Sequence, residues 1–170
     1  MIRPARATAL AVILACGFSV SRAEPFGFPL KNVDGGRPVA LSSFKGKMVL
    51  IELWQTHCGP CRTWRPFFEK LQERFGARGL VVLSVDSEEE ESVVRAYLKA
   101  NPTPLRSFLD PKRKVLDALK AQGVPTMALI DKDGYLIWMA NGFSPSTADE
   151  LTWRIDRELP IIAELPLVKP

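Results

Sequence analysis

The sequence predicts an α/β domain in which helices flank a mixed central β-sheet. Residues 48–54 and 80–85 are apolar runs without polar alternation, which is typical of strands covered on both faces. Helical patterns follow both runs, and glycine-containing turn signals mark a hairpin near either end of the domain. The chain has 170 residues, 46% hydrophobic and 25% charged, which fits one globular domain.

The N-terminal half of the domain begins with a predicted β-hairpin extension. Its strands are Phe28–Lys31 and Val39–Leu41, and Asp34-Gly35-Gly36 is the turn signal between them. A buried strand at Met48–Trp54 leads into a helix over Gly59–Phe75. An internal proline, which removes a backbone donor, should kink this helix. The helix's predicted apolar stripe consists of Trp64, Phe67, Phe68 and Leu71.

The middle of the domain predicts a second buried strand at Leu80–Val85. Ser87 and Glu90 have the spacing of a capping box, so we expect a helix to begin there and run to about residue 100. A short strand is predicted within Pro102–Leu109, and a short helix over Lys112–Lys120.

The C-terminal part predicts a second hairpin and a closing helix. Thr126–Ile130 and Tyr135–Met139 flank the turn signal Lys132-Asp133-Gly134. Thr147 and Glu150 have capping-box spacing, which predicts the start of the last helix.

The first 23 residues have the layout of a secretory signal peptide. Two arginines precede an apolar run that is short for a membrane span, and Ser21–Ala23 offers small residues at a cleavage point. We therefore expect residues 1–23 to be removed and residues 24–160 to form the domain. The proline-rich residues 161–170 should form an extended tail.

Cys16 leaves other interpretations of the leader open. Ile13-Leu14-Ala15-Cys16 is an imperfect bacterial lipoprotein box, which would place a lipid anchor at Cys16, and an uncleaved anchor is the third alternative. All three predict an exported, periplasmic domain. Without the leader's three arginines, the 23 basic residues fall to 20, against 19 acidic residues. The resulting net charge of +1 offers no basic stripe for nucleic acid.

The exported domain retains two cysteines, Cys58 and Cys61. A disulfide across so small a loop would stabilise the fold little. A structural zinc site needs about four Cys or His ligands, and only His57 stands beside the pair, so a donated ligand or Cu(I) would be required. Covalent haem needs His directly after the second cysteine, where this chain has Arg62.

A reactive dithiol explains the pair better. Cys58 stands where a buried strand gives way to a helix N-terminus, and backbone N–H groups and the helix dipole stabilise a thiolate there. Gly59 allows close approach of another chain, and Pro60 suits the first helical turn. Cys61 lies deeper and can attack a mixed disulfide formed at Cys58.

Two separated motifs resemble the thioredoxin family. Trp54-x-x-x-Cys58-Gly59-Pro60-Cys61 is similar to its active site, and Gly123-Val124-Pro125-Thr126 to the loop whose proline is cis in that family. The leader, the N-terminal hairpin and the approach through Phe44–Lys47 resemble the TlpA/ResA-like branch. The resemblance covers about residues 26–159 and implies a thioredoxin fold.

The resemblance also implies roles for particular residues. Cys58 would be the nucleophile and Cys61 the resolving thiol, with a redox-active disulfide between them. The backbone of Val124 would pair with an extended substrate segment beside Pro125 and Thr126. The implied protein is a monomer without a cofactor or a metal. Its implied partners are disulfide-containing client proteins and an upstream membrane electron donor.

Glu52 has a physical argument of its own. It alternates with apolar residues in a strand that is predicted to be buried on both faces, and desolvation should raise its pKa. Thioredoxins keep a buried acid at the matching place, which implies that Glu52 relays a proton to or from Cys61. The alternative is a glutamate that reaches the sheet edge or pairs with a lysine.

Three further features carry weaker predictions. His57 replaces the family's usual Trp, and it either lowers the pKa of the Cys58 thiol or only reshapes the substrate surface. We interpret Trp64 as a packing residue. The acidic run Glu88–Glu91 is interpreted as a solvated helix end, with an acidic docking site as the alternative.

The function predicted from the leader, the dithiol and the resemblance is an exported thiol:disulfide oxidoreductase. The resemblance favours reduction of clients, and apocytochrome c thiols or copper-site cysteines are typical clients of the family, between which the sequence does not select. A peroxidatic enzyme would have Thr or Ser where Gln55 stands. A copper-handling protein would use a wider cysteine spacing and a distant histidine, and no histidine follows Cys61. Strong disulfide oxidants of this fold usually carry a large helical insertion, for which this chain has no room.

Overall fold

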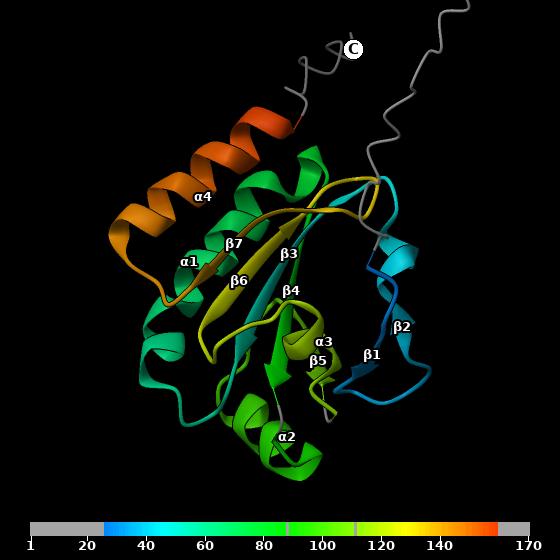
Figure 1. The fold of residues 1–170 in the computed structure, drawn as a ribbon. Coiled ribbons are helices and arrows are strands. Elements are labelled where there is room, and N and C mark those ends of the chain that lie inside the picture. Colours follow the sequence, from blue (N-terminus) through cyan, green and yellow to red (C-terminus); the bar gives the residue numbers. More distant parts are fainter. Residues whose placement is uncertain (1–25, 88, 111, 160–170) are drawn as a thin grey trace, which may run out of the picture.

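The computed structural model describes residues 26–87, 89–110 and 112–159. Its centre is a seven-stranded mixed β-sheet with strand order β2-β1-β5-β4-β3-β6-β7 (Figure 1). The strands are β1 (Pro29–Asn32), β2 (Val39–Ala40), β3 (Met48–Trp54), β4 (Leu80–Ser87), β5 (Arg106–Asp110), β6 (Thr126–Ile130) and β7 (Leu136–Asn141). The α-helices are α1 (Gly59–Phe75), α2 (Glu91–Ala100), α3 (Lys114–Ala118) and α4 (Pro145–Glu158), with short 3-10 turns at Leu41–Phe44 and Gly76–Arg78. The predicted α/β class with a mixed sheet is confirmed.

The centre of the sheet combines parallel and antiparallel pairing. β3 runs parallel to β4 and antiparallel to β6, and β4 runs parallel to β5. β1 is antiparallel to both β2 and β5, and β7 is antiparallel to β6. All seven residues of β3 are buried, as expected for a strand covered on both faces.

Side chains that alternate along β3 and β4 form two apolar layers. Met48 and Leu50 pack under α1 and α4, which lie together on one face of the sheet (Figure 1). Val49 and Ile51 pack on the other face, with α3 and the turn after β2. The predicted alternation along β3 is therefore confirmed, and Glu52 falls on the face that α1 covers.

The predicted helix starts were wrong at two places. Ser87 is the last residue of β4, because pairing with β5 continues to Asp110, and α2 begins at Glu91 without a side-chain cap. In α4 the cap is Ser144, whose Oγ accepts a hydrogen bond from the Thr147 N–H at 3.2 Å. The proline after Ser144 suits the first helical turn, so Ser144 followed by Pro145 was a helix-start signal in the sequence, three residues before the predicted cap at Thr147.

The apolar stripe predicted for α1 is confirmed at Phe68 and Leu71 and was wrong at Trp64 and Phe67. Trp64 and Phe67 are only half-buried, whereas Arg65 is buried. The side chains that face the sheet are Cys61, Arg65, Phe68, Leu71 and Phe75. Trp64 packs against Phe143 with ring centroids 4.4 Å apart, in agreement with its predicted packing role.

The predicted leader with Cys16 and the predicted tail at 161–170 lie outside the described residues. Within the ranges that the structure describes, no helix combines the length and apolarity needed to cross a membrane.

Candidate active site

Cys58 and Cys61 form a disulfide at the junction between β3 and α1, with an S–S distance of 1.98 Å and Cα atoms 5.3 Å apart. Cys58 is the N-cap of α1, and its Sγ accepts a hydrogen bond from the Cys61 N–H at 3.2 Å. Gly59 is the first helical residue, and Pro60 follows it within the first turn. A charge on Cys58 Sγ would therefore face backbone donors and the positive end of the helix dipole.

The two sulfurs differ in access. Cys58 is 8% exposed and Cys61 is 0% exposed. Both residues are buried, but only Cys58 has any surface open to another protein. The geometry thus separates an accessible sulfur from a shielded one behind it.

The bond between Val124 and Pro125 is cis, as the resemblance implied. Val124 packs against the apolar cluster that contains both cysteines, so this loop lies beside the disulfide. Thr126 is fully buried, and its Oγ1 donates to the Gly123 carbonyl at 2.7 Å. Its hydroxyl therefore supports the loop from within and is closed to a substrate.

Trp54 lies beneath the site. It is fully buried, and its ring contacts the Arg65 guanidinium at 4.4 Å and the Tyr97 ring at 5.4 Å. Trp54 can shape the active site from below, but it does not line the surface that a substrate would meet.

Glu52 is fully buried in the sheet layer under α1, between Ser84 of β4 and Met127 of β6. Neither carboxylate oxygen makes a hydrogen bond of normal length to another described residue. Burial raises the pKa of Glu52 from 4.5 to about 7, and the nearby charge of Arg65 and the hydroxyl of Ser84 offset that rise only in part. The predicted burial and the direction of the pKa shift are both confirmed.

Arg65 is a residue of the site that the sequence analysis missed. It is 8% exposed, and its three guanidinium nitrogens have no hydrogen-bond partner among the described residues. Its charge is accommodated by the faces of Trp54 and Tyr97 and by the proximity of Glu52. The spacing of Cys61, Arg65 and Phe68 was the available signal, since it places the arginine on the buried face of α1.

The loop before Cys58 is held by an acid from the run that was predicted to be solvated. Glu89 accepts hydrogen bonds from the Thr56 N–H and the Thr56 hydroxyl, at 2.5 and 2.7 Å. The His57 side chain is 74% exposed, with its Nδ1 3.5 Å from Glu89 Oε1. For Glu89 the solvated interpretation was wrong. Glu91 fits it, because it pairs at the surface with Lys31 and Arg95, while Glu88 lies outside the described residues.

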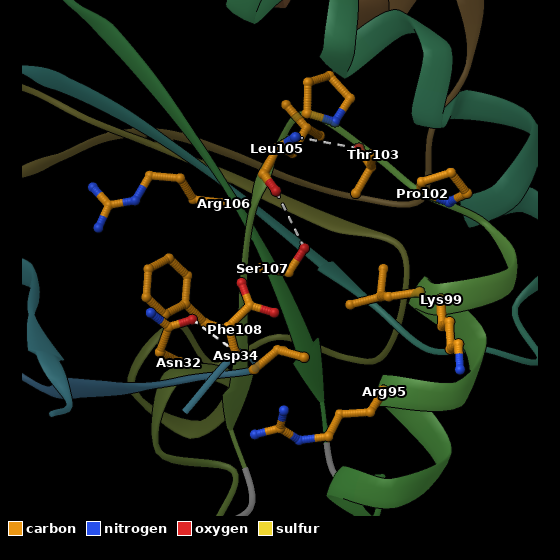
Figure 2. A pocket seen from close by; sticks show the side chains of 13 residues that line it. Asn32, Asp34, Arg95, Lys99, Pro102, Thr103, Leu105, Arg106, Ser107 and Phe108 are labelled. Atoms are coloured by element: carbon orange, nitrogen blue, oxygen red, sulfur yellow. Dashed lines mark hydrogen bonds between the residues drawn. The ribbon is translucent and has the colours of Figure 1, made fainter. Parts of the chain in front are cut away.

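A groove of about 510 Å³ lies between α2 and β5, away from the disulfide (Figure 2). Arg95 and Lys99 of α2 and Arg106 of β5 contribute its basic side chains. None of the predicted site residues lines this groove. Within the described ranges, no three His, Cys, Asp or Glu side chains gather closely enough to hold a metal ion.

A cysteine pair at a strand–helix junction, beside a cis proline on a mixed sheet, defines a protein of the thioredoxin fold. The chain matches the Redoxin family over residues 21–152 and belongs to that family.

The sequence is similar to proteins that are named as thiol-disulfide oxidoreductases. The thiol-disulfide oxidoreductase ResA of Bacillus subtilis (strain 168) is 30% identical over 115 residues, which cover 68% of this chain and 64% of ResA. The ResA relatives that head this comparison are matched over only about three-fifths of their length.

Solved structures show the same fold. A Chlorobium tepidum protein assigned as the thiol:disulfide interchange protein DsbE has a TM-score of 0.74 at 27% identity, covering 84% of this chain and 100% of that one. The exposed lipoprotein thioredoxin Etrx1 of Streptococcus pneumoniae strain TIGR4 has a TM-score of 0.69 at 29% identity, covering 77% and 98%. The thioredoxin fold predicted from the two motifs is thereby confirmed.

Proposed function

We propose that this protein is an exported thiol:disulfide oxidoreductase that reduces disulfides in client proteins. The observation that carries the proposal is the position of Cys58 as the N-cap of α1, where it is the partly exposed member of the pair, with the fully buried Cys61 in the first turn. ResA and DsbE, which this chain resembles, are named for the same chemistry.

The reaction follows from the two positions. In the reduced protein, the Cys58 thiolate attacks one sulfur of a client disulfide, and the other client sulfur leaves as a thiolate. Cys61 then loses its proton and attacks Cys58 Sγ, which breaks the mixed disulfide and releases the client's second thiolate. Two electrons pass to the client, and the protein is left with the Cys58–Cys61 disulfide.

Glu52 is our candidate for the group that takes the Cys61 proton. A pKa of about 7 lets its carboxylate accept a proton and its acid return one at neutral pH. Arg65 lies close enough to Glu52 to lower that pKa, so we assign to Arg65 the role of keeping the pKa of Glu52 near neutral pH.

Clients are expected to bind beside the disulfide. An extended client segment would pair with the Val124 backbone next to Pro125, while Gly59 and Pro60 leave room for it and the exposed His57 borders it. We also propose a periplasmic location, a membrane donor that recharges the dithiol, and a monomeric state. A lipid anchor at Cys16 is the alternative to removal of the leader.

Insulin reduction with a small-dithiol donor tests the function. Cys58→Ser should abolish turnover, because no other described thiol can attack. Cys61→Ser should accumulate mixed disulfides with clients, since the resolving step is lost. Ser43→Ala, at an exposed position in the turn after β2, is the control and should retain turnover. Full activity of Cys58→Ser would rule out the mechanism.

A further inference from the structure

Three residues before Cys58 form a loop that an unusual carboxyl pair holds in place. We propose that Glu89, supported by Asp86, is a positioning residue that pins Thr56 and thereby fixes the Cys58 thiol for attack. This inference deepens the proposed function and rests on Cys58 being the attacking sulfur.

The loop is tied from two sides. From the β4–α2 connection, Glu89 accepts both hydrogen bonds of Thr56, and the Ser87 carbonyl accepts one from Gln55 Nε2 at 2.6 Å. From α1, Arg62 Nη1 donates to the Thr56 carbonyl at 3.0 Å. The Cys58 N–H itself donates to the Gln55 carbonyl at 3.1 Å, so movement of this loop moves the nucleophile.

Glu89 is in turn oriented by Asp86, which is fully buried at the carboxyl end of β4. Asp86 Oδ1 accepts a hydrogen bond from the Glu89 N–H at 3.0 Å. Asp86 Oδ2 makes no hydrogen bond to another described residue, but the two carboxyl groups are close enough to influence each other's protonation, and two negative charges at this place would repel.

The proton of this pair belongs to Asp86. Burial and the adjoining Glu89 raise the pKa of Asp86. Partial burial alone would raise the pKa of Glu89, but the nearby Asp86 carboxyl and the hydrogen bonds from Thr56 outweigh it and lower that pKa. Among the described residues, the other titratable groups at the pair are Asp110 on β5, which disfavours ionisation of Asp86, and His57 on the loop, whose Nδ1 lies 3.5 Å from Glu89 Oε1.

The arrangement has two consequences. At neutral pH, an ionised Glu89 holds Thr56 with charge-assisted hydrogen bonds, which are stronger than neutral ones. When Asp86 loses its proton at alkaline pH, two adjacent carboxylates repel each other, and the anchor of Thr56 weakens. The loop should therefore be best ordered while the pair keeps one proton.

An ordinary helix-start acid would not have these contacts. The N-cap of α2 is the exposed Glu90, and its first-turn acid is Glu91. Glu89 precedes both and turns toward the active-site loop. Glu90 thus provides a matched control that carries the same charge one residue away.

The test is the rate of iodoacetamide alkylation of Cys58 in the reduced full-length protein, followed from about pH 5 to pH 10 with the modified site mapped by mass spectrometry. We expect Glu89→Gln to lower the neutral-pH rate about tenfold, the scale of one lost charge-assisted hydrogen bond. Glu90→Gln should stay within about twofold, as for a surface substitution. In the wild type, the rate per thiolate should decline at alkaline pH, where Asp86 loses its proton. In Asp86→Asn the side chain cannot ionise, so this decline should disappear.

Two results would overturn the proposal. One is a Glu89→Gln rate equal to that of Glu90→Gln. The other is an alkaline decline that Asp86→Asn leaves unchanged. If Glu89→Gln does not fold, Thr56→Val removes only the hydroxyl bond and should still slow alkylation about threefold. Alkylation needs no client, so a wild-type protein that fails to reduce insulin while keeping these rate differences would reject the proposed function alone.

Discussion

The buried carboxyl of Glu52 makes a quantitative prediction about stability. Glu52→Gln keeps the size and hydrogen-bonding shape of the side chain but removes its ability to ionise. We expect the variant to become more stable than the wild type as the pH rises, because wild-type folding must keep a proton on Glu52 or bury its charge.

The sign and size follow from the pKa of Glu52, which burial raises from 4.5 to about 7 in the folded state. Between these pH values the folded protein holds a proton that the unfolded chain has lost, so the wild-type unfolding free energy falls as the pH rises. A tenfold change in a protonation constant corresponds to about 1.4 kcal/mol, so the total loss reaches about 3 kcal/mol by about pH 8. Below about pH 4.5 this contribution vanishes.

Urea unfolding of the oxidised protein, followed by tryptophan fluorescence at several pH values, measures the effect. The stability gap between Glu52→Gln and wild type should widen by about 3 kcal/mol from about pH 4.5 to pH 8. Glu73→Gln, on the exposed side of α1, is the matched control and should show a constant gap. A gap for Glu52→Gln that does not change with pH would refute the argument that Glu52 is neutralised by burial.

Two further substitutions test other contacts of the core. Arg65→Met keeps a buried aliphatic side chain but removes the positive charge near Glu52, so the pKa of Glu52 should rise above about 7. The pH dependence of urea unfolding described above should then shift to higher pH. Arg74→Met, at an exposed position of the same helix, should not shift it. Gln72→Ala removes the side chain that bonds Leu80 O and Val82 N where β5 does not reach β4, and urea unfolding should show a loss of about 2 kcal/mol. The control is Gln122→Ala at an exposed position, which should change stability by less than about 0.5 kcal/mol. Equal losses in the two variants would contradict the stabilising role of the Gln72 hydrogen bonds.

The sheet and the cysteine site were predictable because their signals are local. Met48–Trp54 and Leu80–Val85 lie in the buried centre of the sheet, and their residues are apolar apart from Glu52 and Ser84, so the pattern of a buried strand was clear. The strand–helix junction at Cys58 followed from the end of one pattern and the start of another. Glu52 was conspicuous because it is the one acid within an otherwise apolar run.

The residues that were missed depend on contacts distant in the sequence. Ser87 looked like a helix cap, but the length of β4 was decided by its pairing with Asp110. Arg65 has the composition of a surface residue, and only the aromatic faces of Trp54 and Tyr97 make its burial tolerable. Glu89 sat in a run of four acids, and its role depends on a loop more than thirty residues earlier.

The register of β3 and β4 explains why the polar groups collect at one end of the sheet. Paired residues of parallel strands share a face, so Glu52 and Ser84 form one row, and Trp54 and Asp86 form the next. The preceding rows on that face, from Met48 to Val82, are apolar and pack under the later turns of α1. Only the carboxyl end of the sheet lies under the first turn of α1, where the disulfide lies. Acids placed elsewhere on this face would bear the same cost of burial but would lie in the apolar rows, away from the end of the sheet where the proposed proton transfer takes place.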